Sequence, residues 1–361
     1  MHVELTDTQR QLRETIRGFA RTRVAPAAAE TDRAARFPRE LVAALGELGV
    51  MGCIVPEAHG GAGVDAVAWT LAVEELAAAC ASTALVFAAH TALATGPLVQ
   101  HATAAQQARW LPRLASGEVL GCLAVSGDVV ARRAGDNWVL GGSVRFVTNG
   151  AEAGLALVVA GERGFVVDTS SRGWTAARRD DRTGLRGAAP ADVTLRDVRV
   201  PGDALLADGG AIAAAARDGW RIALGAVGVG MARAAVDASL AYARERRVFG
   251  EPIAAFQGAQ WRLADMATAV ESARLLTLRA AFLKDRGLPY TSEAAMAKVF
   301  AAETAMTLAT QAVQMHGGYG YTREFPVERH FRDAAAVGTL GETPAVERLA
   351  IADHLLGEAR A

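Results

Sequence analysis

The sequence predicts a mostly helical α+β fold in three consecutive parts. An N-terminal α-helical domain is expected over residues 1–115, a middle antiparallel β domain over 116–208 and a C-terminal helical bundle over 209–361. Three observations predict this order: Ala-rich and Leu-rich segments with helical spacing come first, short Val-rich runs follow, and long apolar-periodic segments come last. Long antiparallel helices joined by short turns form a bundle, so the last part is expected to be one.

The first domain begins with a helix signal. Thr6 followed by Gln9 matches a capping box, and helical composition continues to about Ala29. A second helix is expected in residues 37–49, since its Leu residues fall at helical spacing and Gly49 ends the pattern. Further helices are expected in two Ala-rich segments within 65–99 and in one segment over 106–116.

The middle domain is expected to be a small antiparallel β unit. Short runs rich in Val, separated by Gly and Asp, are typical of such strands. The expected strands cover residues 119–126, 137–149, 155–161, 164–169 and 191–201, and Pro201 ends the last one.

The last domain contains three long helical patterns, in residues 211–247, 257–286 and 291–316. Gly317 and Gly318 end the third pattern. The glycine-rich stretch Gly225–Gly230 lies inside the first helical pattern and does not follow a strand. We therefore expect it to allow close helix packing rather than to bind a dinucleotide phosphate.

Composition excludes several classes of function. The chain has 38 basic and 39 acidic residues, so nothing predicts binding to nucleic acid or to an anionic membrane surface. The three cysteines lie far apart in apolar contexts, which predicts buried thiols in a reducing compartment. No secretion signal is recognised, and the uncharged stretch Leu76–Gly96 is too weakly apolar to predict a membrane span. We expect a cytoplasmic protein without a metal site, because the histidines never fall at ligand spacing.

A candidate phosphate-binding segment lies between two bundle helices. ERRVFGEPIAAFQ, Glu245–Gln257, combines two adjacent arginines with an aromatic ring and a carboxamide. These groups can clamp a phosphate, stack on a ring and donate hydrogen bonds. On composition alone, a solvated helix end with an ordinary core Phe is the favoured interpretation.

Four motifs in order along the chain resemble the FAD-dependent acyl-CoA dehydrogenase family. They are FPRELVAALGELGVMGCIVPEAHGGAG from Phe37, SVRFVTNG from Ser143, ERRVFGEPIAAFQ from Glu245 and QMHGGYGYTREFPVERHFRDA from Gln314. The likeness extends over nearly the whole chain. It implies a C-terminal four-helix bundle and an FAD bound between the domains and a neighbouring subunit, hence a homodimer or homotetramer.

The resemblance also implies which residues bind FAD. One set matches the family's clamp on the pyrophosphate and adenine side, and a second set surrounds the isoalloxazine, where an aromatic ring covers the flavin and hydroxyls bond to it. The first set is Arg246, Phe249, Gln257, Gln314, Gly317 and Gly318, and the second is Val125, Ser126, Phe146, Thr148 and Thr343.

Three departures from the family pattern concern the substrate and its base. The family's loop after Thr-Glu-Pro is shortened here at Val125-Ser126-Gly127-Asp128, which weakens the expectation of coenzyme A and favours an acyl group on a carrier protein. The family's catalytic Glu position falls on Gly341, with Glu342 at the following glycine. The minority location of the base, on the first bundle helix, is Trp220. Beside it, Asp218 and Arg221 match the acid and the arginine next to the acyl pocket, and the arginine steadies the active-site loop.

The resemblance implies α,β-dehydrogenation of an acyl thioester, in which a base removes the α-proton while the β-hydride moves to flavin N5. Glu342 is the candidate base if the loop shifts by one residue, which the flexible Gly338 and Gly341 allow. The alternative is a flavin monooxygenase for N- or C-hydroxylation that needs no base, with Trp220 reshaping the pocket. A third alternative is a flavoprotein without turnover.

Overall fold

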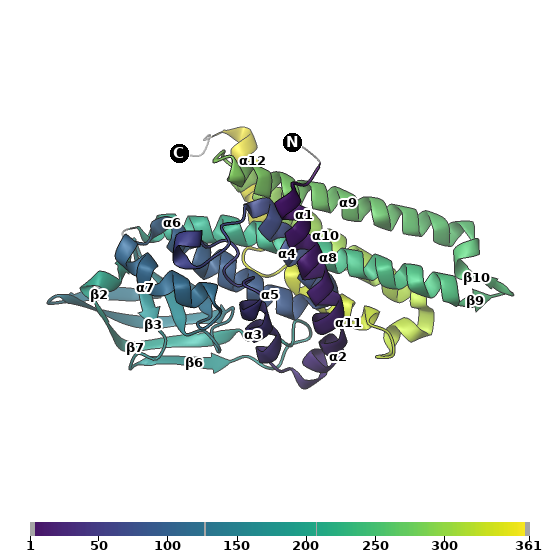
Figure 1. Ribbon diagram of the computed structural model, residues 1–361. Coiled ribbons are helices and arrows are strands. Elements are labelled where there is room, and N and C mark those ends of the chain that lie inside the picture. Colours follow the sequence, from purple (N-terminus) through teal and green to yellow (C-terminus); the bar gives the residue numbers. More distant parts are fainter. Residues whose placement is uncertain (1–3, 126–127, 207, 358–361) are drawn as a thin grey trace.

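The computed structural model describes residues 4–125, 128–206 and 208–357. Three parts follow one another along the chain, as the sequence predicts, and the protein is mostly helical. In Figure 1 the two β-sheets lie at one end of the molecule, and the small β9–β10 hairpin lies at the opposite end of the long helices.

The N-terminal part is entirely helical in the described residues. The predicted capping box is confirmed. The Thr6 side-chain oxygen accepts a hydrogen bond from the Gln9 backbone N–H, and the Gln9 side-chain oxygen accepts one from the Thr6 backbone N–H. The Ala-rich stretch forms separate helices, as expected, and Cys80, whose backbone is extended, lies between the first two of them. The helices are α1 (Asp7–Phe19), α2 (Ala25–Ala34), α3 (Arg39–Glu47), α4 (Ala66–Ala79), α5 (Ala81–Ala89), α6 (Gly96–His101) and α7 (Ala104–Ala115), with π-helical turns at Ala20–Val24 and His90–Thr95.

The middle part consists of two four-stranded sheets. One has the order β1 (Gly121–Val125), β4 (Leu155–Ala160), β5 (Arg163–Asp168) and β8 (Leu205–Leu206). The other has the order β2 (Val130–Ala134), β3 (Asn137–Val147), β7 (Ala191–Pro201) and β6 (Trp174–Arg178). A cluster of buried Val, Leu and Ala side chains, with Phe165, forms the core of this domain.

The expectation of purely antiparallel pairing is wrong for one pair, since β1 and β4 run parallel, with Gly121 opposite Leu155 and Val125 opposite Val159. The chain leaves β1 to form β2 and β3 of the other sheet, and this long excursion lets it return in the same direction. Strands β2, β6 and β8 were not predicted. β2 and β6 are largely exposed and carry Arg and Ala rather than a Val-rich run, and β8 has only two residues.

The C-terminal part is a bundle of α8 (Gly209–Glu245), α9 (Gln257–Asp285), α10 (Thr291–His316), α11 (Val327–Val337) and α12 (Pro344–Leu356). β9 (Arg247–Val248) and β10 (Glu251–Pro252) form the hairpin between α8 and α9. A Cβ at Gly228 would lie 2.8 Å from the Ala301 carbonyl oxygen, and one at Gly230 would lie 2.4 Å from that of Glu74. The glycines of α8 thus permit close packing on α10 and α4, as the sequence analysis expects.

Two helical stretches, Ala81–His101 and Gly209–Glu245, are long and apolar enough to cross a membrane by length and composition alone. In this fold 89% and 83% of their apolar windows are buried inside the protein. They therefore serve here as core helices. Cys53, Cys80 and Cys122 are also buried, as free thiols.

Candidate functional site

A cavity of about 670 Å³ lies where the three domains meet, and we call it the interdomain cavity. Strands β1 and β3, helix α8, the segment before α6 and the loop after α11 supply its walls. It gathers many of the residues that the sequence analysis selects from distant parts of the chain. Its lining consists of Leu93, Leu123, Val125, Val144, Arg145, Phe146, Val147, Thr148, Ala213, Arg217, Trp220, Thr339, Leu340, Gly341 and Glu342.

Phe146 is placed at this cavity by a β-bulge. The register of β3 on β7 shifts between Val144 and Val147, and Phe146 adopts a φ of 55°, which is unusual for a residue with a Cβ. The Phe146 N–H donates to Asp192 Oδ1 at 3.2 Å, and Arg179 Nε donates to Asp192 Oδ2 at 3.0 Å. The hydrogen bond from Arg179 holds the pKa of Asp192 below its ordinary value. The bulge leaves Phe146 55% exposed, with the guanidinium carbons of Arg145 and Arg179 at 5.5 and 5.1 Å from its ring centroid.

Trp220 and Gly341 meet in the cavity wall. Gly341 has a φ of 66°, and a Cβ built on it would lie 2.9 Å from Trp220 Cδ1. The sequence analysis places both usual locations of the family's base at these two residues. In the fold the indole of Trp220 fills the space that a side chain at position 341 would need.

Glu342 is half-buried and lines the cavity beside Gly341. The buried Lys298 ammonium donates a hydrogen bond to the Glu342 carbonyl oxygen and lies 3.4 Å from Glu347 Oε1. Burial lowers the pKa of Lys298, and the nearby Glu347 carboxylate opposes that shift. Arg221 Nε lies 2.7 Å from the other oxygen of Glu347, in the first turn of α12. The loop that carries Glu342 is therefore tethered to both α8 and α10.

Asp218 does not line the cavity. It is buried, accepts from Arg221 Nη1 at 2.9 Å and accepts from the Thr291 hydroxyl at 2.5 Å, so it orients Arg221. Thr343 is exposed and directly follows Glu342, where it begins α12 without using its side chain as a cap. Ser126, another predicted flavin contact, lies outside the described residues.

Four residues of this region were not predicted from the sequence: Lys298, Glu347, Arg145 and Arg217. A signal was available for the two arginines, because each adjoins a residue that was predicted, Phe146 and Asp218. No comparable signal existed for the other two, since they reach Arg221 and the loop only through tertiary packing.

The predicted pyrophosphate clamp lies at the other end of the bundle. Phe249, at the tip of the β9–β10 hairpin, is 95% exposed, and the Arg246 guanidinium carbon lies 5.7 Å from the Tyr319 ring centroid. This contact joins the hairpin to the turn after Gln314, so the two predicted parts of the clamp come together. Figure 1 shows this hairpin far from the sheets that carry Phe146 and Thr148. One chain therefore does not bring the clamp and the isoalloxazine residues into a single site.

The residues present fit FAD, but in two separate places. The interdomain cavity suits the flavin ring, and the clamp at the other end of the bundle suits the pyrophosphate. The interdomain cavity offers the Phe146 ring and the Thr148 hydroxyl, both suited to a flavin ring. At the clamp, open space lies where a Cβ on Gly317 or Gly318 would point, so backbone and phosphate can approach closely. Arg246 and Gln257 are exposed beside it and free to donate to phosphate oxygens.

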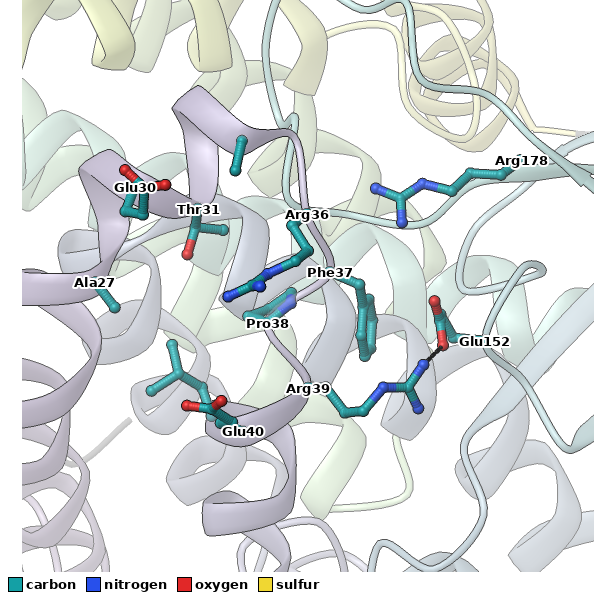
Figure 2. A pocket seen from close by; sticks show the side chains of 12 residues that line it. Ala27, Glu30, Thr31, Arg36, Phe37, Pro38, Arg39, Glu40, Glu152 and Arg178 are labelled. Carbon is teal, nitrogen blue, oxygen red and sulfur yellow. Dashed lines mark hydrogen bonds and ion pairs between the residues drawn. The ribbon is translucent and has the colours of Figure 1, made fainter.

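A second cavity, of about 450 Å³, lies between α2, α3 and the β domain (Figure 2). Arg36, Arg39 and Arg178 surround it together with Phe37. Two of these arginines have carboxylate partners, because Arg39 pairs with Glu152 and Arg178 pairs with Asp180. None of the predicted site residues lines this cavity, and its charges are largely compensated.

Comparison with known proteins agrees with this architecture. The chain matches the family descriptions "Acyl-CoA dehydrogenase, N-terminal domain" over residues 6–118 and "Acyl-CoA dehydrogenase, C-terminal domain" over residues 207–356. It is 40% identical to the mitochondrial short-chain specific acyl-CoA dehydrogenase of Bos taurus, over 98% of this chain and 91% of the relative.

Two solved structures extend the comparison. A glutaryl-CoA dehydrogenase from Mycobacterium smegmatis in complex with FADH2 superimposes with a TM-score of 0.93 at 29% identity, covering 98% of this chain and 96% of the other. The prolyl acyl carrier protein oxidase AnaB superimposes with a TM-score of 0.92 at 26% identity, covering 98% of this chain and all of the other. The chain therefore belongs to the acyl-CoA dehydrogenase family and is a flavoenzyme of that type.

Proposed function

We propose that the protein is an FAD-dependent oxidoreductase that converts an acyl thioester to its α,β-unsaturated form, with Glu342 as the base. One observation carries the proposal. Among the described residues, the lining of the interdomain cavity contains Phe146 and Thr148, which suit a flavin, and one acidic side chain, that of Glu342.

The bound FAD would supply the acceptor for the hydride that leaves the β-carbon. The Glu342 carboxylate removes the α-proton, and the electrons of that C–H bond form the new double bond. Lys298 holds the Glu342 carbonyl oxygen and so limits the positions that the carboxylate reaches. Arg221 and Glu347 fix the end of the same loop. The chain thus supplies a half-buried carboxylate on a tethered turn beside an aromatic wall.

We propose that a carrier protein, rather than free coenzyme A, presents the acyl group. The shortened loop after Val125 removes residues that the family uses near the coenzyme, and a structural relative is named as an oxidase of an acyl carrier protein. The relatives reported above do not favour the monooxygenase alternative, because their names give acyl-CoA dehydrogenases and an acyl carrier protein oxidase.

We also propose that the enzyme is a homodimer or homotetramer. The clamp lies far from the interdomain cavity of the same chain, so a flavin that uses both halves spans two subunits. Sedimentation analysis of the FAD-loaded protein is expected to give at least a dimer, and a monomer that retains FAD would contradict this proposal.

The reaction is tested by anaerobic mixing of the FAD-loaded enzyme with butyryl thioesters of coenzyme A and of an acyl carrier protein. Flavin bleaching is expected with the carrier-bound substrate, at a higher rate than with the coenzyme A thioester. Glu342→Gln keeps the size of the side chain, removes the base and is expected to slow bleaching by about 10²–10⁴-fold. Absence of bleaching with all acyl thioesters, or an unchanged rate in Glu342→Gln, would contradict the proposal.

A further inference from the structure

Two arginines line the interdomain cavity beside the proposed reaction centre. Arg145 precedes Phe146 on β3, and Arg217 lies on α8. Residues three apart on a helix share a face, so Arg217 and Trp220 lie one turn from each other on the cavity side. Trp220 in turn borders Gly341, next to Glu342. Two cations therefore line the same cavity as the proposed base, Glu342.

Neither arginine is well paired within the part of the chain that the structure describes. The guanidinium carbon of Arg145 lies 5.5 Å from the Phe146 ring centroid. Its charge acts on Asp192, but the Asp192 carboxylate accepts its side-chain hydrogen bonds from Arg179 and not from Arg145. Arg217 has only a 4.0 Å approach to Asp218, whose oxygens already accept from Arg221 and Thr291. Neither arginine forms an ion pair with Glu342 in these residues.

The rest of the cavity wall is largely apolar, with Leu93, Leu123, Val144 and Leu340. A ligand that fills the cavity displaces water from both guanidinium groups, which is costly unless the ligand supplies acceptors. A neutral acyl chain offers none at that position. A carboxylate offers two oxygens that match the guanidinium fork, and its charge compensates the cations.

We propose that the acyl group of the substrate carries a carboxylate, which Arg145 and Arg217 bind at the wall of the interdomain cavity. This inference rests on the proposed function, since it specifies the substrate class of that site. The phosphate of a carrier arm is separated from the thioester by the whole pantetheine chain, whereas Arg217 lies one helical turn from Trp220. The oxidised isoalloxazine that Phe146 and Thr148 would hold in the same cavity is uncharged. The anion that these arginines meet therefore belongs to the acyl group.

The test uses the FAD-loaded enzyme and pantetheine thioesters, which lack phosphate. Glutaryl- and pentanoyl-pantetheine have acyl chains of equal carbon number and differ by one carboxylate. The kcat/KM for flavin reduction is expected to favour the glutaryl compound by about 10- to 100-fold, the range for one or two charge-assisted hydrogen bonds. Arg145→Leu and Arg217→Leu are each expected to lower the glutaryl value by about 10-fold and to leave the pentanoyl value within about twofold.

Arg217→Lys is the conservative variant, and it is expected to retain part of the preference because it keeps the charge but loses the fork. Arg10→Leu is the matched control, because Arg10 is an exposed arginine that pairs with Asp7 on α1, away from the cavity. It is expected to keep the full preference. Equal use of both thioesters by the unaltered enzyme, or equal losses on both in Arg217→Leu, would overturn the inference.

A binding readout separates this inference from the proposed reaction. FAD-loaded Glu342→Gln is titrated with each thioester, and the change in the flavin absorption spectrum gives a Kd without turnover. Tighter glutaryl binding that disappears in Glu342→Gln/Arg217→Leu supports the carboxylate site even if no thioester is ever dehydrogenated. Equal Kd values for the two compounds overturn it, whatever the reaction proves to be. If Arg217→Leu weakens both carrier-bound thioesters equally and leaves both pantetheine thioesters unchanged, the anion is the carrier phosphate and the inference is also wrong.

Discussion

Helix α8 carries two arginines in opposite surroundings, Arg217 at the interdomain cavity and Arg233 in the core. Arg233 donates to Glu74 Oε1 at 2.9 Å and to Glu75 Oε2 at 2.6 Å. Arg13 and Arg17 also bind Glu75, and Arg274 binds Glu74. Arg217 has only a distant contact with Asp218. Arg233 therefore stabilises the folded structure, whereas the Arg217 guanidinium is available to bind a ligand.

Three arginines donate hydrogen bonds to the buried Glu75 carboxylate and stabilise its charge. Burial alone would raise the pKa of Glu75, but hydrogen bonds from Arg233 and Arg17 outweigh it and bring the pKa down to about 2. The two acids join the N-terminal helices α1 and α4 to the bundle helices α8 and α9. The interdomain cavity has no such network around Arg145 and Arg217 in the described residues, which is the property expected of a site that exchanges ligands.

The largest expected effect is the loss of stability in Glu75→Ala. Removing one partner of a buried charged cluster leaves uncompensated charge, here on Arg233, and such losses are about 3–5 kcal/mol. Denaturant unfolding of the FAD-loaded protein measures this free energy. Glu271→Ala is the control, because Glu271 pairs with Arg274 at the exposed edge. A cost below about 1 kcal/mol for Glu75→Ala would contradict a structural role for the cluster.

The next effect concerns pH. The pKa of Glu75 in the fold, about 2, lies below its ordinary value of 4.5, so its ionised form stabilises the folded state above pH 4.5. This contribution is lost as the pH falls from 4.5 toward 2, and it amounts to roughly 3 kcal/mol. The difference in unfolding free energy between the unaltered protein and Glu75→Gln is expected to shrink over that window. A difference that stays constant from pH 6 to pH 3 would count against the assigned ionisation.

A smaller effect is expected at the cavity wall in Gly341→Ala. The positive φ of Gly341 and the 2.9 Å approach of a Cβ to Trp220 both oppose a side chain there, at a cost of about 1–3 kcal/mol. Trp220→Leu removes the contact but not the backbone strain. The double variant Gly341→Ala/Trp220→Leu is therefore expected to recover part of the cost, measured as unfolding free energies in a double-mutant cycle. Purely additive costs would show that Trp220 does not occupy the space of a side chain at position 341.

Sequence patterns predicted what depends on local chemistry. The Thr6 capping box, the Ala-rich helices and the long bundle helices are encoded by neighbours in the chain, and the structure has all of them. The parallel pairing of β1 with β4 depends on how the chain passes between two sheets, which no local pattern reports. β2 was missed because an exposed strand of Arg and Ala has no apolar alternation.

The same limit applies to the site. Phe146, Thr148 and Glu342 were selected one at a time from motifs, and the fold gathers them at one cavity. Trp220 and Gly341 lie far apart in the sequence but meet in the fold. The sequence therefore contained no sign that the Trp220 indole leaves no room for a side chain at position 341. In the sequence, Lys298 and Glu347 look like ordinary charged residues of helices. In the fold both are buried, and Glu347 pairs with Arg221 and Lys298.

The smallest expected effect concerns Arg217, compared again with Arg233 on the same helix. Arg217→Leu removes a half-exposed side chain whose single approach to a carboxylate is 4.0 Å, and its cost in unfolding free energy is expected to be below about 0.5 kcal/mol. Arg233→Leu deprives two buried carboxylates of a donor and is expected to cost about 3 kcal/mol or more. Denaturant unfolding of both variants under one set of conditions makes the comparison. If Arg217→Leu proved as destabilising as Arg233→Leu, Arg217 would belong to the folding scaffold, and its effect on thioester preference could not be assigned to ligand binding.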